Sequence, residues 1–314
     1  MNYDIYVVGT VAVENESMSF DPVSPDKISR FIGGAVIFSA YAEIASGAKV
    51  GALVKIHPDD RYLLGPFFIR DLTVLPSRQT TTTQLIYHTP DRERRTSRFS
   101  SCADTIIPAD LPEGVEAEIF QMAGSFLGEF DDALFAELAG RGRVACDLQG
   151  YVRRVADDGQ ILYHDWEKKM TYLPYIDFLK ADAAEAEVIT GQNDRYKAAR
   201  MLHAWGAKEI MITHHTEVIV FDGQSFYVCP LRPRDLTGRS GRGDTAFGSY
   251  LATRLHTPIR PALRYAAALV SLKMEAIGPF KGSRENVETF IQLGYPDCAV
   301  YSLDDQHIME EAYK

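Results

Sequence analysis

The sequence predicts an α/β fold in which a mostly parallel central sheet is covered by helices on both faces. Short apolar runs alternate with helix-length amphipathic segments along most of the chain, which is the pattern of successive strand–helix units. The 314 residues are 46% hydrophobic, which is enough for a sizeable buried core. Neither an internal repeat nor a low-complexity linker interrupts the pattern, so we predict one domain over residues 1–314.

Each element is predicted from its own run of residues. Six apolar runs are predicted to be strands, at residues 5–9, 49–54, 118–122, 144–147, 178–180 and 209–213. Helices are predicted between several of these strands, at residues 35–46, 131–140, 183–190 and 195–205. Two more strands flank Asp222-Gly223, a hairpin turn signal, at residues 217–221 and 225–229. The last part is predicted to be helical, at about 245–255, 261–275 and 285–293.

Two stretches do not fit this alternation. Residues 11–32 are polar and turn-rich, whereas residues 79–100 combine a Thr-rich extended segment with a charged tip at 91–95 and a return. Both stretches could build a small β-lid over a cleft, or they could be separate surface excursions. Periodicity alone leaves both alternatives open.

Charge and cysteine usage restrict the partners and the compartment. A net charge of −10 with both signs spread along the chain argues against nucleic-acid and anionic-membrane partners. The four cysteines form no CxxC pair, so neither a zinc site nor a disulfide framework is predicted. The chain starts without a basic n-region or a cleavage site, and no apolar run reaches the length of a membrane span. We therefore expect a cytoplasmic protein.

A glycine loop at residues 235–248 is the most informative stretch. Gly241 and Gly243 let the backbone turn tightly before a predicted helix, so that N–H groups and the helix dipole point in one direction. Such an arrangement binds anions and suits a transferring phosphoryl group. A stretch of eleven residues that overlaps this loop contains four arginines, at positions 232, 234, 239 and 242.

Asp244 follows the loop and has two possible roles. A carboxylate beside an anion site is a poor choice for binding alone, but it can take the proton from an attacking hydroxyl. The alternative is that Asp244 caps the helix N-terminus. No GxxxxGK[ST] motif occurs, which excludes a P-loop. The stretch 241–246 satisfies GxGxxA, but a second helix follows in place of a strand with a ribose-binding acid, so a nicotinamide-dependent oxidoreductase is disfavoured.

The stretch 240–247, with the sequence SGRGDTAF, resembles the second signature of the ribokinase-like (PfkB) carbohydrate kinase family. Further matches follow in the family's order over nearly the whole chain. Residues 9–14 resemble the end of its first strand, and Gly33-Gly34 resembles the glycine pair of its first signature. Residues 182–191 resemble its NxxE segment. The ordered set favours Asp244 as the base.

This resemblance implies a three-layer α/β/α fold with a β-lid formed from about 11–32 and 79–100. It implies transfer of the γ-phosphoryl group of Mg-ATP to an alcohol, with Asp244 as the base and with phosphoryl contacts from Gly241, Arg242 and Gly243. ATP would contact five residues: Thr213, Gly238, Gly241, Gly243 and Lys273. The acceptor would contact Glu14, Gly33, Gly34, Phe38, Asp147, Gln149 and Arg153. Magnesium would be held, through water, by Asp182 and Glu185.

Several of these residues have other possible roles. Asp182 and Glu185 also form a DxxE capping box before a helix, which is compatible with holding a metal-bound water. Glu14 ends the first strand, where ligands bind to parallel sheets, but it could instead be a solvated lid carboxylate. Arg153 could bind a phosphate or form a surface ion pair.

Departures from the family pattern bear on the substrate. The loop alanine is Arg242 here, and Gly238 replaces the acid six residues before the base, so the monovalent-cation requirement stays open. Phe38 replaces a sugar-binding asparagine, and residues 147–153 and 273–280 resemble the branch that contains inositol kinases. We therefore favour a cyclitol acceptor, with a nucleoside kinase as the alternative and a non-catalytic nucleotide-binding regulator or an oxidoreductase as less favoured ones. A small alcohol and ATP are the expected partners, and a homodimer is compatible with this pattern.

Overall fold

A computed structural model describes residues 2–21, 27–65, 69–89 and 94–303 of the chain. Its centre is a ten-stranded sheet in the order β16-β15-β14-β13-β12-β9-β8-β1-β4-β5. The strands from β13 to β5 pair in parallel, whereas β14, β15 and β16 add antiparallel pairs at one edge. Their bounds are β1 Asn2–Thr10, β4 Val50–Ile56, β5 Asp71–Pro76, β8 Glu116–Ala123, β9 Arg143–Asp147, β12 Phe178–Asp182, β13 Glu209–Thr213, β14 Glu217–Phe221, β15 Ser225–Pro230 and β16 Ala299–Ser302.

The predicted mostly parallel α/β sheet is therefore confirmed, and all eight predicted strands are present. The hairpin is confirmed as well, because β14 and β15 pair across a turn in which Gly223 has a φ of 91°. Two strands were not predicted from the sequence, β5 and β16, and these are the two edge strands. Each edge strand has a neighbour on one side only, so its sequence is less constrained to be apolar.

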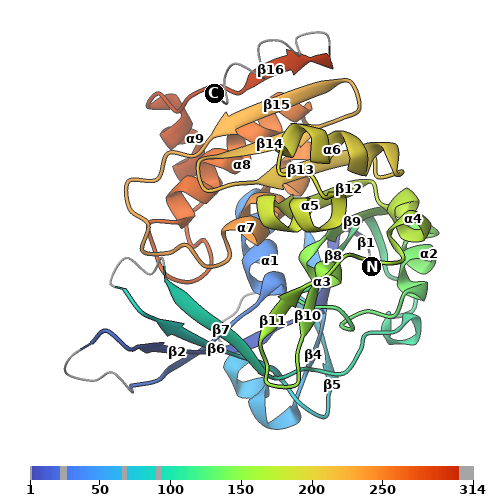
Figure 1. Cartoon of the computed structure of the whole chain (residues 1–314), viewed down its shortest axis with the longest axis vertical. Helices are drawn as coiled ribbons and strands as arrows, with labels where there is room; N and C mark the ends of the chain where they lie inside the picture. Colours follow the sequence, from blue (N-terminus) through green and yellow to red (C-terminus); the bar gives the residue numbers. More distant parts are fainter. Residues whose placement is uncertain (1, 22–26, 66–68, 90–93, 304–314) are drawn as a thin grey trace.

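Helices cover both faces of the sheet, which gives three layers (Figure 1). One face packs against four helices: α1 Ala35–Ala45, α7 Arg242–Arg254, α8 Ile259–Lys273 and α9 Arg284–Gln292. The other face packs against α2 Ala133–Ala139, α5 Ala183–Thr190 and α6 Arg195–Ala204, with two short helices nearby, α3 Gln149–Val152 and α4 Lys169–Tyr172. Among the described residues, every helix is too short or too polar to cross a membrane.

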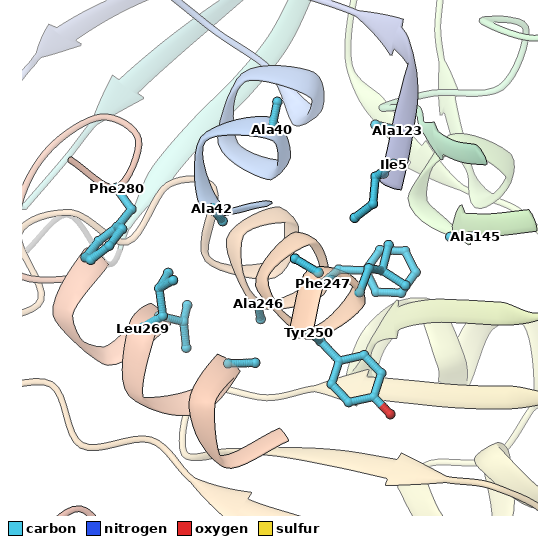
Figure 2. Close-up of a cluster of buried hydrophobic side chains, with 14 of the residues drawn as sticks. Ile5, Ala40, Ala42, Ala123, Ala145, Ala246, Phe247, Tyr250, Leu269 and Phe280 are labelled. Atoms are coloured by element: carbon cyan, nitrogen blue, oxygen red, sulfur yellow. The ribbon is translucent and has the colours of Figure 1, made fainter. Parts of the chain in front are cut away.

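The contact between α1 and α7 fixes the two helices that begin at the candidate site. Small side chains, among them Ala40 and Ala246, lie in the core around these helices beside Phe247 (Figure 2). Gly248 allows the close approach, because a Cβ atom there would lie only 2.6 Å from the backbone oxygen of Ser39. Because the two helices pack closely, neither can shift without moving the other, so the N-termini of α1 and α7 keep a fixed position relative to each other.

The two stretches outside the alternation form a second, four-stranded sheet, which we call the lid sheet (Figure 1). Its order is β3-β2-β6-β7, with bounds β3 Ser29–Gly33, β2 Ala12–Met18, β6 Thr81–Tyr87 and β7 Arg95–Ser101. The predicted small lid is therefore one sheet rather than two separate excursions. Residues 91–93 of the predicted charged tip at 91–95 lie outside the described residues. A short hairpin, β10 Arg153–Val155 and β11 Ile161–Tyr163, touches β7 where Phe99 N donates to Gly159 O at 2.9 Å.

Candidate active site

The glycine loop turns into α7 through Gly241, the helix N-cap, which has a φ of 74°. This left-handed conformation favours glycine, and a Cβ atom at Gly241 would lie 2.2 Å from the ring of Phe38. Phe38 therefore packs directly beneath the loop. The first turn of α7 starts at Arg242, whose N–H donates to Arg239 O at 3.2 Å, so the next N–H groups, of Gly243 and Asp244, and the positive end of the helix dipole lie at the loop.

A cavity of about 310 Å³ lies in front of this helix end, and we call it the donor cavity. Among the described residues, its lining is entirely polar or glycine and includes four cationic side chains, those of Arg153, Lys180, Arg239 and Arg242. The other lining residues are Gln149, Asp182, Thr213, Ser240, Gly241, Gly243 and Asp244. The set of cations and the helix end make this cavity suited to a polyanion with several phosphate oxygens.

Asp244 is the third residue of α7, whereas the N-cap of this helix is Gly241. The N-cap alternative for Asp244 is therefore wrong. Gln149 Nε2 donates instead to Asp244 Oδ1 at 3.2 Å, which orients the carboxylate. Asp244 lines the donor cavity and also a second cavity, so it lies between them.

The second cavity has a volume of about 150 Å³ and lies between the lid sheet and the start of α1; we call it the acceptor cavity. Glu14 lies in β2 of the lid sheet, so its predicted place at the end of the first strand is wrong, because β1 ends at Thr10. It lies against Gly33, where a Cβ atom would be 2.4 Å from Glu14 Oε1. Apolar side chains form much of the remaining wall, namely Phe38, Leu85, Phe99 and Ile161. Ser240, Gln149, Arg153 and Gly241 are shared with the donor cavity.

The structure places the predicted residues in two groups. Glu14, Gly34 and Phe38 line the acceptor cavity, Asp182, Thr213, Arg242 and Gly243 line the donor cavity, and Gln149, Arg153, Gly241 and Asp244 line both. The remaining predicted residues line neither of these two cavities: Gly33, Asp147, Glu185, Gly238 and Lys273. Gly238 and Lys273 line a small third cavity together with Phe38. Of the four clustered arginines, only Arg239 and Arg242 line the donor cavity; Arg234 pairs with Glu275 at an exposed position.

A comparison with protein families decides the class. The model of the pfkB family carbohydrate kinases matches residues 71–284, which is more than half of the chain. The chain belongs to the pfkB family of carbohydrate kinases. The predicted family and the predicted ribokinase-like fold are thereby confirmed.

Relatives of this pfkB-family kinase include inositol, cytidine and ribose kinases. A solved pyrophosphate-dependent kinase in the ribokinase family, complexed with a pyrophosphate analogue and myo-inositol, is 32% identical with a TM-score of 0.81, and the match covers 91% of this chain and 99% of that one. A pyrophosphate-dependent myo-inositol-1 kinase, converted by two substitutions into a myo-inositol-3 kinase, is 32% identical with a TM-score of 0.80, over 93% and 100% of the chains. A cytidine kinase from Thermococcus kodakarensis is 28% identical over 79% of this chain and 87% of its own length. Arabidopsis thaliana ribokinase, at 16% identity and a TM-score of 0.71 over 93% and 99% of the chains, shares the fold.

One site residue of this pfkB-family kinase was missed by the sequence analysis. Lys180 lies in β12 with 3% of its surface exposed, and its Nζ atom is 2.9 Å from Asp147 Oδ2 and 3.7 Å from Glu185 Oε2. A Cβ atom on Gly243 would lie 2.9 Å from the same Nζ, so this ammonium sits directly beside the first turn of α7. A lysine inside an otherwise apolar strand is the signal that could have revealed it.

Burial and the neighbouring charges together set the pKa values of Lys180 and of the two carboxylates beside it, Asp147 and Glu185. Burial alone lowers the pKa of Lys180, but the carboxylates of Asp147 and Glu185 raise it above its ordinary value, so the ammonium is retained. Burial raises the pKa of Asp147, against the opposing effect of Lys180. The pKa of Glu185 is lowered because Lys180 and Arg153 outweigh its burial. The Lys180 ammonium therefore stays charged at the donor cavity, with the carboxylates of Asp147 and Glu185 beside it.

The predicted magnesium residues lie at the edge of this cluster. Asp182 is the N-cap of α5 and accepts from Glu185 N at 2.8 Å, while Glu185 Oε2 accepts from Asp182 N at 2.7 Å, so the predicted capping box is present. Glu185 Oε1 is bound by Arg153 at 2.6 Å, and both of its oxygens are thus occupied. Among the described residues no group of three or more metal-ligating side chains occurs. Asp182 lines the donor cavity, and it fits a magnesium ion held mainly by oxygen atoms of a bound phosphoryl donor and by water.

Proposed function

We propose that this chain transfers a phosphoryl group from pyrophosphate to a hydroxyl group of a cyclitol such as myo-inositol. The proposal differs from the sequence-based expectation in its donor, which was ATP. Solved relatives above 30% identity are described as pyrophosphate-dependent, and one of the structures is a complex with myo-inositol. The acceptor follows the sequence-based preference for a cyclitol.

The choice of pyrophosphate as the donor rests on the residues that line the donor cavity. A nucleotide needs an apolar or aromatic surface for its base, as most small-molecule sites provide. None of the eleven described residues that line the cavity is apolar, and four of them are cationic. Such a lining can neutralise the charge of pyrophosphate, whereas it offers the base of a nucleotide no apolar side chain within this cavity.

The same geometry supports a direct in-line transfer. Asp244 lies between the two cavities and would take the proton of the accepting hydroxyl as its oxygen attacks the nearer phosphorus. The bond between that phosphorus and the bridging oxygen breaks, and orthophosphate leaves while a phosphomonoester forms. The N–H groups at the start of α7, together with Arg242 and Lys180, would stabilise the charge on the transferring group. Magnesium, held through Asp182, would neutralise further donor charge.

The acceptor cavity favours a compact ring that carries hydroxyl groups. Glu14 can accept hydrogen bonds from adjacent hydroxyls, and a site built on such bonds rejects analogues that lack them. Phe38 offers an apolar wall to one face of the ring. The volume of about 150 Å³ favours a single small ring over a nucleoside, which adds a base to its sugar.

A second candidate function is an ATP-dependent nucleoside kinase. Its support is the 28% identity to a cytidine kinase, which extends over 79% of this chain. It retains Asp244 and the helix end in the same roles but requires room for two bases, one on the donor and one on the acceptor.

Steady-state kinetics with a matrix of donors and acceptors tests the proposal. Pyrophosphate and ATP would each be paired with myo-inositol, ribose and cytidine, with orthophosphate or ADP release as the readout. We expect the highest kcat/KM for pyrophosphate with myo-inositol. Efficient turnover of ATP with cytidine, and none of pyrophosphate with myo-inositol, would favour the second candidate.

A further inference from the structure

Lys273 is a buried lysine that lines neither the donor nor the acceptor cavity. It is the last residue of α8 and has 2% of its surface exposed. Its Nζ atom donates to two backbone carbonyl groups of the glycine loop, those of Gly238 and Ser240. The same Nζ lies 4.9 Å from the centre of the Phe38 ring, the ring that packs beneath Gly241.

The residue that follows Lys273 also binds the glycine loop. Gly238 N donates to Met274 O at 2.7 Å, so Gly238 is bound through both its N–H and its carbonyl group by consecutive residues at the end of α8. No larger residue fits at this position, because a Cβ atom on Gly238 would lie 1.8 Å from Ala276 O. The loop that leads into α7 is therefore pinned at 238 and at 240, immediately before the turn at Gly241.

We propose that the Lys273 ammonium acts as a tethered cation that holds loop 238–241 in its anion-binding conformation. Two carbonyl oxygens and an aromatic face are groups that bind a monovalent cation such as K⁺ or NH₄⁺. Lys273 supplies such a cation as part of the chain, so the loop needs none from solution. It is a positioning residue: it acts on the N–H groups at the α7 N-terminus through the backbone, without touching the donor.

The electrostatic environment agrees with a charged side chain. Burial lowers the pKa of Lys273 to about 8, while Glu14 and Asp244 act in the opposite direction. The ammonium is thus the main form at neutral pH. A lysine that served only to fill space could be replaced by an apolar residue of similar length, which gives the experiment its contrast.

The experiment measures pyrophosphate and sulfate binding by calorimetry, together with kcat, in K⁺-free buffer. Lys273→Ala leaves the carbonyl groups facing an empty space, and we expect anion affinity to fall about 10- to 100-fold, as for the loss of charged hydrogen bonds. Added NH₄Cl or KCl should restore affinity saturably, whereas tetramethylammonium chloride at equal ionic strength should not. The wild type and Lys281→Ala, an exposed lysine in the next loop, should not respond to K⁺ or NH₄⁺.

Lys273→Met keeps the length of the side chain and fills the space, so it should lose affinity without recovery by any cation. Melting curves of both variants show whether the fold is retained, and the methionine variant keeps the test open if the alanine variant unfolds. Unchanged anion affinity in Lys273→Met, or a loss in a folded Lys273→Ala that no monovalent cation reverses, would overturn the inference. The inference rests on the proposed phosphoryl site, but anion binding separates the two, because a wild type that binds pyrophosphate and transfers nothing contradicts only the proposed function.

Discussion

The side-chain amide of Gln149 donates a hydrogen bond of 3.2 Å to Oδ1 of Asp244, across 95 positions of sequence. Gln149 N in turn donates to Asp147 Oδ1 at 3.0 Å, and Asp147 is bound to Lys180. The Asp244 carboxylate, which lies between the two cavities, is therefore oriented by a chain of polar contacts. The chain runs from Lys180 in β12 through Asp147 in β9 to Gln149. This arrangement holds the Asp244 carboxylate through a side-chain contact, as its proposed role as the base requires.

Gln149→Leu removes this hydrogen bond and keeps the approximate volume of the side chain. We expect kcat to fall about 5- to 10-fold, which corresponds to about 1 kcal/mol for a hydrogen bond. In an Asp244→Asn background the same change should have little further effect, since the two residues would act as a unit. Initial rates of the single and double variants test this, and additive losses would show that Gln149 acts independently of Asp244.

Arg242 lines the donor cavity, whereas Arg234 from the same arginine cluster is exposed and pairs with Glu275. Arg242→Ala keeps the backbone N–H group but removes the cation, so we expect a raised KM for the donor and a lower kcat. Arg234→Ala is the matched control and should change neither. Kinetics with varied pyrophosphate decides the matter, and identical behaviour of the two variants would remove Arg242 from the site.

Glu14 lines the acceptor cavity and is 8% exposed, whereas its strand neighbour Asn15 lines neither cavity. Glu14→Ala should raise the acceptor KM by about tenfold or more, as expected for a lost charged hydrogen bond, and leave the donor KM unchanged. Asn15→Ala is the control, because successive strand residues point to opposite faces. An equal rise in both KM values for Glu14→Ala would indicate that the lid sheet, and not the acceptor contact, had been damaged.

Glu43 in α1 is fully buried, and neither of its carboxylate oxygens has a hydrogen-bond partner among the described residues. Burial raises the pKa of Glu43 to about 8. The unfolded chain ionises Glu43 near its ordinary pKa, so the folded state binds more protons and the free energy of unfolding should fall between about pH 4.5 and pH 8. Each unit of pKa difference is worth about 1.4 kcal/mol, so several kcal/mol are involved.

Glu43→Gln removes this titration, and its stability relative to the wild type should therefore increase as the pH rises through this range. Urea unfolding at pH 5, 6.5 and 8 measures the difference. Glu113→Gln, at an exposed loop position, is the control and should not show this trend. Parallel stability profiles for Glu43→Gln and the wild type would mean that the Glu43 carboxyl finds a partner or water when it ionises.

The sequence could predict the central sheet because its buried strands are strongly apolar runs, and the glycine loop because its turn chemistry is local. It could not predict β5 and β16, since edge strands are less constrained, nor the pairing of β2 with β6, which joins segments about 70 residues apart. Lys180 was missed for a similar reason. Its role depends on Asp147, Glu185 and the start of α7, and these come together only in the folded chain.

The choice of donor shows the same limit. The motif around Gly241 and Gly243 predicts a phosphoryl site but says nothing of what lies beyond the phosphates. The polar lining of the donor cavity comes from β12, β13, α3 and the glycine loop together, so it is a property of the fold. Asp147 and Lys273, which were predicted to contact substrate and ATP, form hydrogen bonds to other protein groups in the structure, to Lys180 and to the carbonyl groups of Gly238 and Ser240, and their ligand contacts stay a prediction.

The most direct test of the account is ³¹P NMR of the reaction between pyrophosphate and myo-inositol, with the wild type and with Asp244→Asn. Asp244 is not the N-cap of α7, so the substitution should leave the melting temperature nearly unchanged while it removes the base. We predict that the wild type produces equal amounts of orthophosphate and a phosphomonoester, and that Asp244→Asn does so about 10²- to 10⁴-fold more slowly. Near-normal phosphomonoester formation by Asp244→Asn, or none by the wild type with pyrophosphate, would contradict the account.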